Sequence, residues 1–304
     1  MKIDPAILRV HQGVTRTPVG MATGLTTCRL SNENQVEVLE FLRERPLQTA
    51  VMSGLIIDNG IKSTLNRGSF YACRNAAGAI QAVALIGHAI FLESRCDKAL
   101  KELARLAQGL GGAHMIMGEQ KMVERFWASY VESGQLRRHL GREVLLELSQ
   151  APPDLATVTE LRLADSNDLS LIVPTHAAMA REESGVNPLE KDPEGFRARC
   201  RRRIEQGRTW VLIEDGELIF KADLIVDTPE VIYVEGVCVH TERRRQGIGS
   251  RCMAQLSSQL LQRARSISLL VNEQRRGALH FFQNLGFVAR GSYDTVFLHE
   301  RSYH

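Results

Sequence analysis

The stretch VIYVEGVCVHTERRRQGIGS, Val231 to Ser250, joins a strand-like segment to a glycine-containing turn. Its first nine residues are rich in β-branched and aromatic side chains, which favour a buried strand. A helical pattern, MAQLSSQLLQRA, follows at 253–264. A glycine turn at the start of a helix presents unpaired backbone N–H groups and the positive end of the helix dipole to one point. This order therefore predicts an anion site of the kind that binds a pyrophosphate.

The two glycines of the turn fall in the pattern Arg244-x-x-Gly247-x-Gly249. A Cβ atom at either glycine would hold a phosphate away from the backbone, and Arg244 and Arg245 add cationic donors. A basic surface turn ahead of an ordinary helix is the alternative interpretation of the same residues. The segments that follow decide between the two.

The turn and its downstream sequence resemble the GNAT superfamily of N-acetyltransferases. In that family, Arg/Gln-x-x-Gly-x-Gly/Ala follows the fourth strand and holds the pyrophosphate of acetyl-CoA. The segment SLLVNEQRRGALHFFQNLGF at 268–287 is similar to the family's next strand, its Asn-containing turn and the helix that ends in Gly-Phe. The resemblance implies an α/β (α+β) fold with a mixed, mostly antiparallel sheet flanked by helices, and acetyl-CoA as the acyl donor.

A chain of 304 residues exceeds the usual size of one hydrophobic core, so two domains are expected. Strand and helix signals occur twice in the same order, and the first copy has no Arg-x-x-Gly-x-Gly after its strand HAIFL at 88–92. The whole chain thus resembles the tandem GNAT proteins of actinobacteria, with a degenerate first copy. The predicted parts are an arm at 1–24, a first domain at 25–149, a linker at 150–158 and a GNAT domain at 159–304.

The composition of the chain excludes several classes of binding partner. A formal charge of +3 from 38 basic and 35 acidic residues is too balanced for a general nucleic-acid binder. The six cysteines form no Cys-x-x-Cys pair, and no apolar run approaches the roughly 20 residues of a membrane helix. We therefore expect a cytoplasmic protein without metal, nucleic-acid or membrane partners. The arginine-rich segment at 196–208 is predicted to be a solvated helix.

The resemblance also assigns the residues that would bind acetyl-CoA. The backbones of Val237 and Val239 would pair with pantetheine where the fourth and fifth strands part, and Gly236 would form the bulge that opens them. Asn272 would bond the pantetheine arm or simply stabilise a turn, and Arg275 would reach a phosphate of CoA. The residues expected around the pyrophosphate are Arg244, Arg245, Gln246, Gly247, Ile248, Gly249 and Ser250.

The acceptor amine must reach the thioester without its proton, and the leaving thiolate must receive one. Glu235 is the candidate base or amine anchor, because a carboxylate on a buried strand needs a partner; the alternative is that it pairs with a core arginine or lies at a strand edge. Glu182 and Glu183 would attract a cationic acceptor, or would be ordinary solvated acids at a helix end. Lys221 would anchor an acidic group of the acceptor, or would snorkel from its strand.

The usual acid of the family is missing. Many members donate the proton from a tyrosine on the helix before Gly-Phe, and this chain has Phe282 there. Tyr293 is a candidate substitute. The sequence therefore predicts an acetyl-CoA-dependent N-acetyltransferase that acts on a primary amine of a small molecule or a protein, with a non-catalytic acyl-CoA-binding regulatory module as the alternative. A pure interaction scaffold would not need the intact glycine turn.

Overall fold

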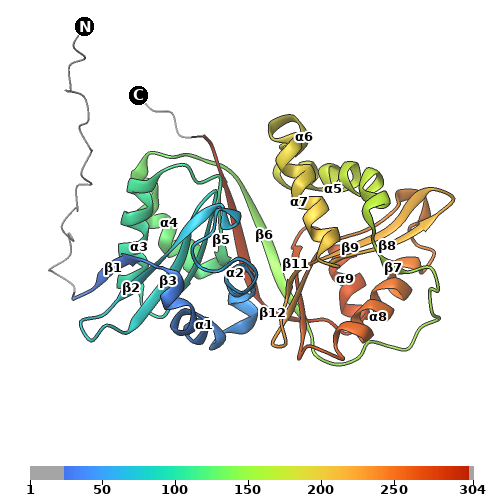
Figure 1. Ribbon diagram of the computed structural model, residues 1–304, viewed down its shortest axis with the longest axis horizontal. Helices are drawn as coiled ribbons and strands as arrows, with labels where there is room; N and C mark the ends of the chain where they lie inside the picture. The colour runs from blue at the N-terminus through green and yellow to red at the C-terminus, as the bar shows by residue number, and fades with distance from the viewer. Residues whose placement is uncertain (1–23, 301–304) are drawn as a thin grey trace, which may run out of the picture.

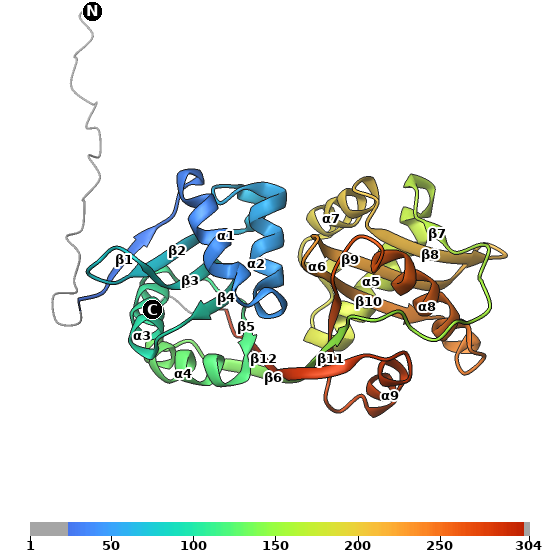
Figure 2. The same cartoon turned by 90° about the horizontal axis from the view of Figure 1, so that it is seen from below.

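The computed structural model describes residues 24–300. The predicted arm at 1–24 therefore lies outside the described residues, apart from Gly24. The chain forms two lobes that share one sheet and are connected by two long strands (Figures 1 and 2). The expected mixed α/β class with a mostly antiparallel sheet is confirmed, since parallel neighbours occur only at β4–β5 and β10–β11.

The first lobe begins with a short strand and two helices, and then alternates strands with two further helices. Its strands are β1 (Thr26–Arg29), β2 (Gly68–Arg74), β3 (Ile80–Gly87), β4 (Ala89–Ser94), β5 (Met115–Glu119) and β6 (Arg137–Leu148). Its helices are α1 (Gln35–Arg43), α2 (Pro46–Asn59), α3 (Asp97–Leu110) and α4 (Gln120–Tyr130).

The second lobe repeats this order. Its strands are β7 (Arg162–Leu163), β8 (Thr209–Glu214), β9 (Glu217–Asp227), β10 (Ile232–Val239), β11 (Ile267–Asn272) and β12 (Val288–Leu298). Its helices are α5 (Leu169–Ser184), α6 (Pro188–Lys191), α7 (Pro193–Glu205), α8 (Ile248–Leu260) and α9 (Arg276–Asn284). Strands β8 and β9 are joined by a hairpin turn in which Asp215 and Gly216 both have positive φ.

The two lobes exchange strands at the centre of the sheet. The strand order is β1-β2-β3-β4-β5-β12-β6-β11-β10-β9-β8-β7. The last strand, β12, thus pairs with β5 of the first lobe, whereas β6 pairs with β11 of the second, and β6 and β12 pair with each other. Each lobe is therefore completed by a strand from the other half of the sequence.

Helix α2 forms the main apolar contact between the lobes. Its sequence, PLQTAVMSGLIIDN, is apolar on more than one side, as expected for a helix enclosed by protein. Met52 and Ile56 pack in the core of the first lobe, while Ala50 packs with Val226 and Tyr233 of the second. Helix α2 thus covers part of the face of the second lobe's sheet opposite α8 and α9 (Figure 2).

The prediction that the arginine-rich helix is solvated is wrong for three of its residues. Arg202 donates to the Asn59 side chain at 2.7 Å, and Arg208 pairs with Asp58 at 2.5 Å. Arg203 reaches the buried Asp223 at 3.0 Å. The helical periodicity of the sequence could not reveal these contacts, because two of the partners, Asp58 and Asn59, belong to α2 of the other lobe.

Two global features complete the fold. Within residues 24–300, no helix has the length and apolar character needed to cross a bilayer. All six cysteines are free thiols.

Candidate functional site

Strands β10 and β11 separate in the middle of the second lobe. Their parallel ladder joins only Ile232 to Ile267 and Tyr233 to Ser268. Beyond that point β10 continues beside β9, with a register shift between Glu235 and Cys238, and β11 continues beside β6. We call the opening between β10 from Val234 to Val239 and β11 the fork. Gly236, with φ at +62°, lies in the shifted segment, which confirms the predicted bulge.

The bulge is supported from behind by a buried ion network. The Lys221 ammonium group is fully buried, contacts the Asp223 carboxylate, and lies 3.4 Å from the carbonyl oxygen of Gly236. A Cβ at Gly236 would come within 2.9 Å of the Lys221 Nζ atom, so only glycine fits there without displacement. The structure thus places Lys221 behind the fork, where its charge is already matched by Asp223.

The same network determines the charge of its other members. Ion pairs with Lys221 and Arg203 outweigh burial and hold the pKa of Asp223 at about 2. Burial lowers the pKa of His176 to about 3, and its ring stacks on Phe196 at 5.4 Å. His176 is therefore neutral near pH 7 and acts as a packing residue.

The glycine turn follows β10 directly. Gly247 has φ at +76°, and an added Cβ would meet open space, so its backbone is accessible on that side. The first intrahelical amide bond at this end runs from the Arg251 N–H to the Gly247 carbonyl, at 3.1 Å. The N–H groups of Ile248, Gly249 and Ser250 therefore have no intrahelical acceptor. An accessible turn followed by free amides fits a pyrophosphate group.

Gly249 has a different reason to be glycine. A Cβ at this position would lie 2.9 Å from Val239 Cγ2 and 3.5 Å from the ring of Phe281. Gly249 thus lets α8 approach the end of β10. A side chain would obstruct a phosphate at Gly247, which faces open space, whereas at Gly249 it would first collide with Val239.

The basic residues of the turn differ in their partners. Arg244 folds back, and its Nε atom donates to the Val239 carbonyl at 3.1 Å. Arg245 is exposed and has φ at +63°. Gln246 donates to the Glu242 carbonyl at 3.1 Å. Arg275, expected near a CoA phosphate, instead pairs with Glu182 at 2.8 Å and so joins the start of α9 to the end of α5.

The remaining candidates for pantetheine binding lie along the fork. Val237 and Val239 are half-buried and pack on the core beneath α8. Because the ladder with β11 ends at Tyr233, their backbones have no strand partner on that side. Asn272, at the end of β11, accepts the Gln274 N–H at 2.9 Å and stabilises a turn, which is the simpler of its two predicted roles.

Glu235 lies on the side of the fork that faces α2 and α5. Its carboxylate makes no hydrogen bond or ion pair with another residue in 24–300, so the predicted alternative of a core arginine partner is not observed. The side chain is exposed to solvent, yet the surrounding protein still raises its pKa. Glu235 is thus a solvent-accessible carboxylate without a cation partner.

Glu183, at the end of α5, interacts electrostatically with Glu235. Burial, and then the charges of Glu235 and Glu143, raise its pKa to about 7, although its side chain remains exposed to solvent. Its neighbour Glu182 is exposed and already paired with Arg275. Of the two predicted acids, Glu183 is thus the one available to a cationic group.

A third carboxylate, Glu143, was not predicted from the sequence. It lies on β6, which comes from the first half of the chain, and stands opposite Asn272 of β11 in the sheet. Burial raises its pKa, and its Oε2 atom accepts the Thr295 hydroxyl at 2.7 Å. No local pattern marks Glu143, because only the exchange of strands brings it to the second lobe.

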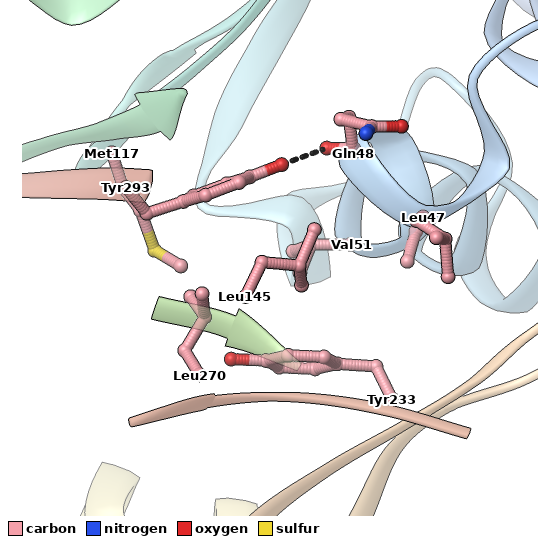
Figure 3. Close-up of a pocket in the computed structure, with 9 residues that line it drawn as sticks. Leu47, Gln48, Val51, Met117, Leu145, Tyr233, Leu270 and Tyr293 are labelled. Carbon is pink, nitrogen blue, oxygen red and sulfur yellow. Dashed lines mark hydrogen bonds between the residues drawn. The ribbon is translucent and has the colours of Figure 1, made fainter. Parts of the chain in front are cut away.

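Tyr293, the candidate proton donor, and Phe282, at the position of the family's usual acid, are both enclosed. Phe282 packs edge-to-face against Phe281 and Phe287 in the core. Tyr293 is 5% exposed, donates to the Gln48 carbonyl at 3.3 Å, and has its pKa raised by burial. It lines a cavity of about 20 Å³ between α2 and the sheet, together with Tyr233 and Leu145 (Figure 3). Tyr293 thus joins the two lobes.

Within residues 24–300, no cluster of three or more His, Cys, Asp or Glu side chains is arranged to hold a metal ion. The site therefore consists of a glycine turn, a fork between strands, and three carboxylates without ion-pair partners: Glu143, Glu183 and Glu235.

Comparisons with known proteins agree with this arrangement. Residues 176–287 match the model of the Acetyltransferase (GNAT) family, a segment that runs from α5 to the residue before β12. No curated protein sequence matches the chain.

Solved structures extend the likeness to both lobes. A GNAT-family acetyltransferase from Colwellia psychrerythraea is 10% identical, with 90% of this chain and 100% of that chain covered and a TM-score of 0.55. A tandem GNAT protein from the clavulanic acid biosynthesis pathway is 13% identical, with 89% and 98% covered and a TM-score of 0.55. A Drosophila protein is 14% identical, with 91% and 99% covered and a TM-score of 0.62. Residues 176–287 thus match the GNAT family model, and the fold of the two lobes is similar to that of a tandem GNAT protein.

Proposed function

We propose that the protein is an acetyl-CoA-dependent N-acetyltransferase that acts on a cationic primary amine. The observation that carries this proposal is the glycine turn with free backbone amides after β10, together with three carboxylates that have no ion-pair partner on the other side of the fork. The positive end of α8 attracts the pyrophosphate, whereas Glu143, Glu183 and Glu235 attract an ammonium group. Two substrates of opposite charge would then approach the same opening from different sides.

The residues that would hold the donor follow from the geometry of the turn. The amides of Ile248, Gly249 and Ser250 would bind the pyrophosphate, with Arg245 as an additional cation. The free edge of β10 at Val237 and Val239 would bond the pantetheine arm. Acetyl-CoA, when bound, supplies an acyl group activated as a thioester.

Glu235 is the proposed base. Its raised pKa suits it to accept a proton from the ammonium group of the acceptor, which leaves a neutral amine. The amine nitrogen then attacks the carbonyl carbon, so that a C–N bond forms and the C–S bond breaks. The second proton of the nitrogen passes to the departing sulfur. The products are an amide and a free thiol, and Glu235 releases its proton to solvent.

The proposed donor site can be tested with one substitution at each end of α8. Ser250→Asp places a negative charge beside the free amides. This charge interacts favourably with the helix dipole but repels a pyrophosphate. Ser258→Asp, at an exposed position of the same helix, is the matched control. Calorimetric titration should show acetyl-CoA affinity weakened by about tenfold or more for Ser250→Asp only. Equal affinities in the two variants would refute a phosphate site at this turn.

The packing of Phe282 favours one other function, a non-catalytic acyl-CoA-binding module. Its ring fills the core where a proton donor is expected, and no tyrosine replaces it there. Release of CoA thiol from acetyl-CoA in the presence of pooled primary amines separates the two functions. Acetyl-CoA binding without amine-dependent thiol release would identify the binding module.

A further inference from the structure

We infer that Lys221 is a positioning residue for acyl transfer. Its buried ammonium group holds the Gly236–Val237 peptide so that the Val237 N–H points into the fork and binds the carbonyl oxygen of the thioester. This inference rests on the proposed N-acetyltransferase function and deepens it. It follows from the direction of the backbone at the bulge, from the contacts of the ammonium group, and from the fit of Gly236 against that group.

The backbone of β10 beyond the bulge alternates between β9 and the fork. The His240 N–H donates to a backbone carbonyl of β9 at 2.8 Å. Successive residues of a strand direct their N–H and C=O groups to opposite sides, so those of Val239 and Val237 point away from β9. The ladder between β10 and β11 ends before these residues, so the side to which they point is the fork.

The Gly236 carbonyl points the other way, towards Lys221. In a trans peptide, the C=O of one residue and the N–H of the next are antiparallel. Since the Val237 N–H points into the fork, the Gly236 C=O points towards β9, where the Lys221 Nζ atom lies 3.4 Å from its oxygen. The register shift between Glu235 and Cys238 separates this carbonyl from the β9 ladder. The ammonium group thus takes the place of a strand partner.

Three acceptors hold the ammonium group in place. They are the Asp223 carboxylate, the Gly236 carbonyl at 3.4 Å and the Nδ1 atom of His176 at 3.5 Å. An ammonium group has three N–H donors, so these contacts use all of them. The His176 ring is neutral near pH 7 and can accept at that atom. Because Lys221 is fully buried, these acceptors rather than solvent determine where its donors point.

Gly236 has the conformation and the space that this contact requires. Its φ of +62° lies in the region that favours glycine. An added Cβ would lie 2.9 Å from Lys221 Nζ and 3.0 Å from Asp223 Oδ2. A side chain at residue 236 would therefore displace the ammonium group from the carbonyl that it holds.

The Val237 N–H lies where the thioester is expected. In the proposed complex, the pantetheine arm starts at the turn after β10 and follows the free edge back from Val239 to Val237, which places its acyl end at Val237. Attack by the amine develops negative charge on the thioester oxygen, and a fixed N–H donor stabilises that charge. A cation at the oxygen end of the same peptide strengthens the donor. Lys221 therefore acts on the reaction through the backbone, without touching the substrate.

The experiment compares Lys221→Met with Arg203→Met. Each variant removes one cation from the Asp223 carboxylate, which keeps the other cation and the Thr209 hydroxyl at 2.8 Å. Both cations also lower the pKa of Glu235, so an effect that acts through the proposed base would appear in both variants. Of the two cations, Lys221 is the one that bonds the bulge. Arg203→Met is therefore the matched control.

The first readout needs no turnover. Acetyl-CoA labelled with carbon-13 at the thioester carbonyl is bound without an amine and measured by isotope-edited infrared spectroscopy. We expect a higher carbonyl stretching frequency in Lys221→Met than in wild type and Arg203→Met, because the hydrogen bond to the carbonyl oxygen is weaker. The second readout is turnover with the best of the pooled amines. We expect kcat to fall by about tenfold or more in Lys221→Met only, with a smaller change in the Kd for acetyl-CoA.

If Lys221→Met does not fold, the double variant Lys221→Met/Asp223→Asn removes the buried ion pair as a unit. It is then compared with Asp223→Asn, and the expected difference is the same. An unchanged carbonyl frequency on loss of Lys221, or equal losses of kcat in Lys221→Met and Arg203→Met, would show that Lys221 only stabilises the fold. Absence of acetyl-CoA binding to wild type in calorimetry would instead count against the proposed function.

Discussion

At the scale of single residues, Glu183 carries the clearest sign of a binding role. Its side chain is accessible, but it lies beside Glu235 and Glu143 and so has its pKa raised to about 7. A protein gains no stability from holding like charges together. Such an arrangement is typical of a site that receives its counter-charge from a ligand.

The repulsion between Glu183 and the neighbouring carboxylates predicts that the effect of Glu183→Gln on stability depends on pH. The ordinary pKa of 4.5 applies to the unfolded chain and about 7 to the folded one, so the folded state binds the proton more tightly. Stability from this group is therefore complete below pH 4.5 and is lost as pH rises towards 7. Glu183→Gln should not change Tm near pH 4.5 but should raise it relative to wild type at pH 8.

Glu182→Gln is the control for this experiment, because it removes the adjacent carboxylate that is already paired with Arg275. Thermal unfolding is recorded in both variants between pH 4.5 and 8. If Glu183→Gln shifts Tm equally at both ends of this range, the charge of Glu183 does not destabilise the fold.

At the scale of elements, the strand, turn and helix around residues 231–260 were predictable because their signals are local. The end of β10, the bulge at Gly236 and the start of α8 at Ile248 all follow from neighbouring residues. The role of Gly249 could not be predicted in this way. The closest contact that a Cβ at Gly249 would make is with Val239, and this contact depends on how tightly α8 packs against β10.

The contact between Gly249 and Val239 can be measured with a double-mutant cycle. Gly249→Ala should lower the free energy of unfolding by about 1–3 kcal/mol, since its Cβ would overlap the Val239 side chain. Val239→Ala removes that overlap. Urea unfolding should therefore give a loss for the double variant that is smaller than the sum of the two single losses. Additive losses would mean that the two positions do not interact.

Contacts between distant segments set the limit of prediction from sequence. The glycine turn, Glu183 and Glu235 could be predicted because each lies at a recognisable strand or helix end. Glu143 could not be found, because its register opposite Asn272 joins residues 129 positions apart, from 143 to 272. The same holds for Arg202 and Arg208, whose partners on α2 precede them by about half the chain.

At the scale of the whole molecule, the strand exchange makes the two lobes dependent on each other. The predicted boundaries at 149 and 159 place β6 and β12 in different domains, yet the two strands are neighbours in the sheet. The linker is itself anchored, since the Val158 N–H donates to Gln255 of α8 at 2.8 Å. Neither half contains all the strands of its own sheet.

Separate expression of residues 1–149 and 150–304 tests this dependence. Each fragment would expose unpaired strand edges at the centre of its sheet, so each should aggregate or remain unfolded when produced alone. Co-expressed fragments should form a one-to-one complex that binds acetyl-CoA. In a second variant, a protease site is inserted into the whole chain beside the exposed Leu155. After cleavage, its two pieces should elute together in size-exclusion chromatography. If fragment 150–304 alone is folded and monomeric and binds acetyl-CoA like the whole chain, the exchange is not required.

The position of β12 also has a consequence during biosynthesis. This strand follows every other described strand in the sequence, yet it fills the place between β5 and β6. During translation, the sheet of the first lobe therefore has a gap until residues 288–298 have left the ribosome. Because pairing across such a long separation is slow, the nascent chain has an extended period in which its open edges need protection from other chains.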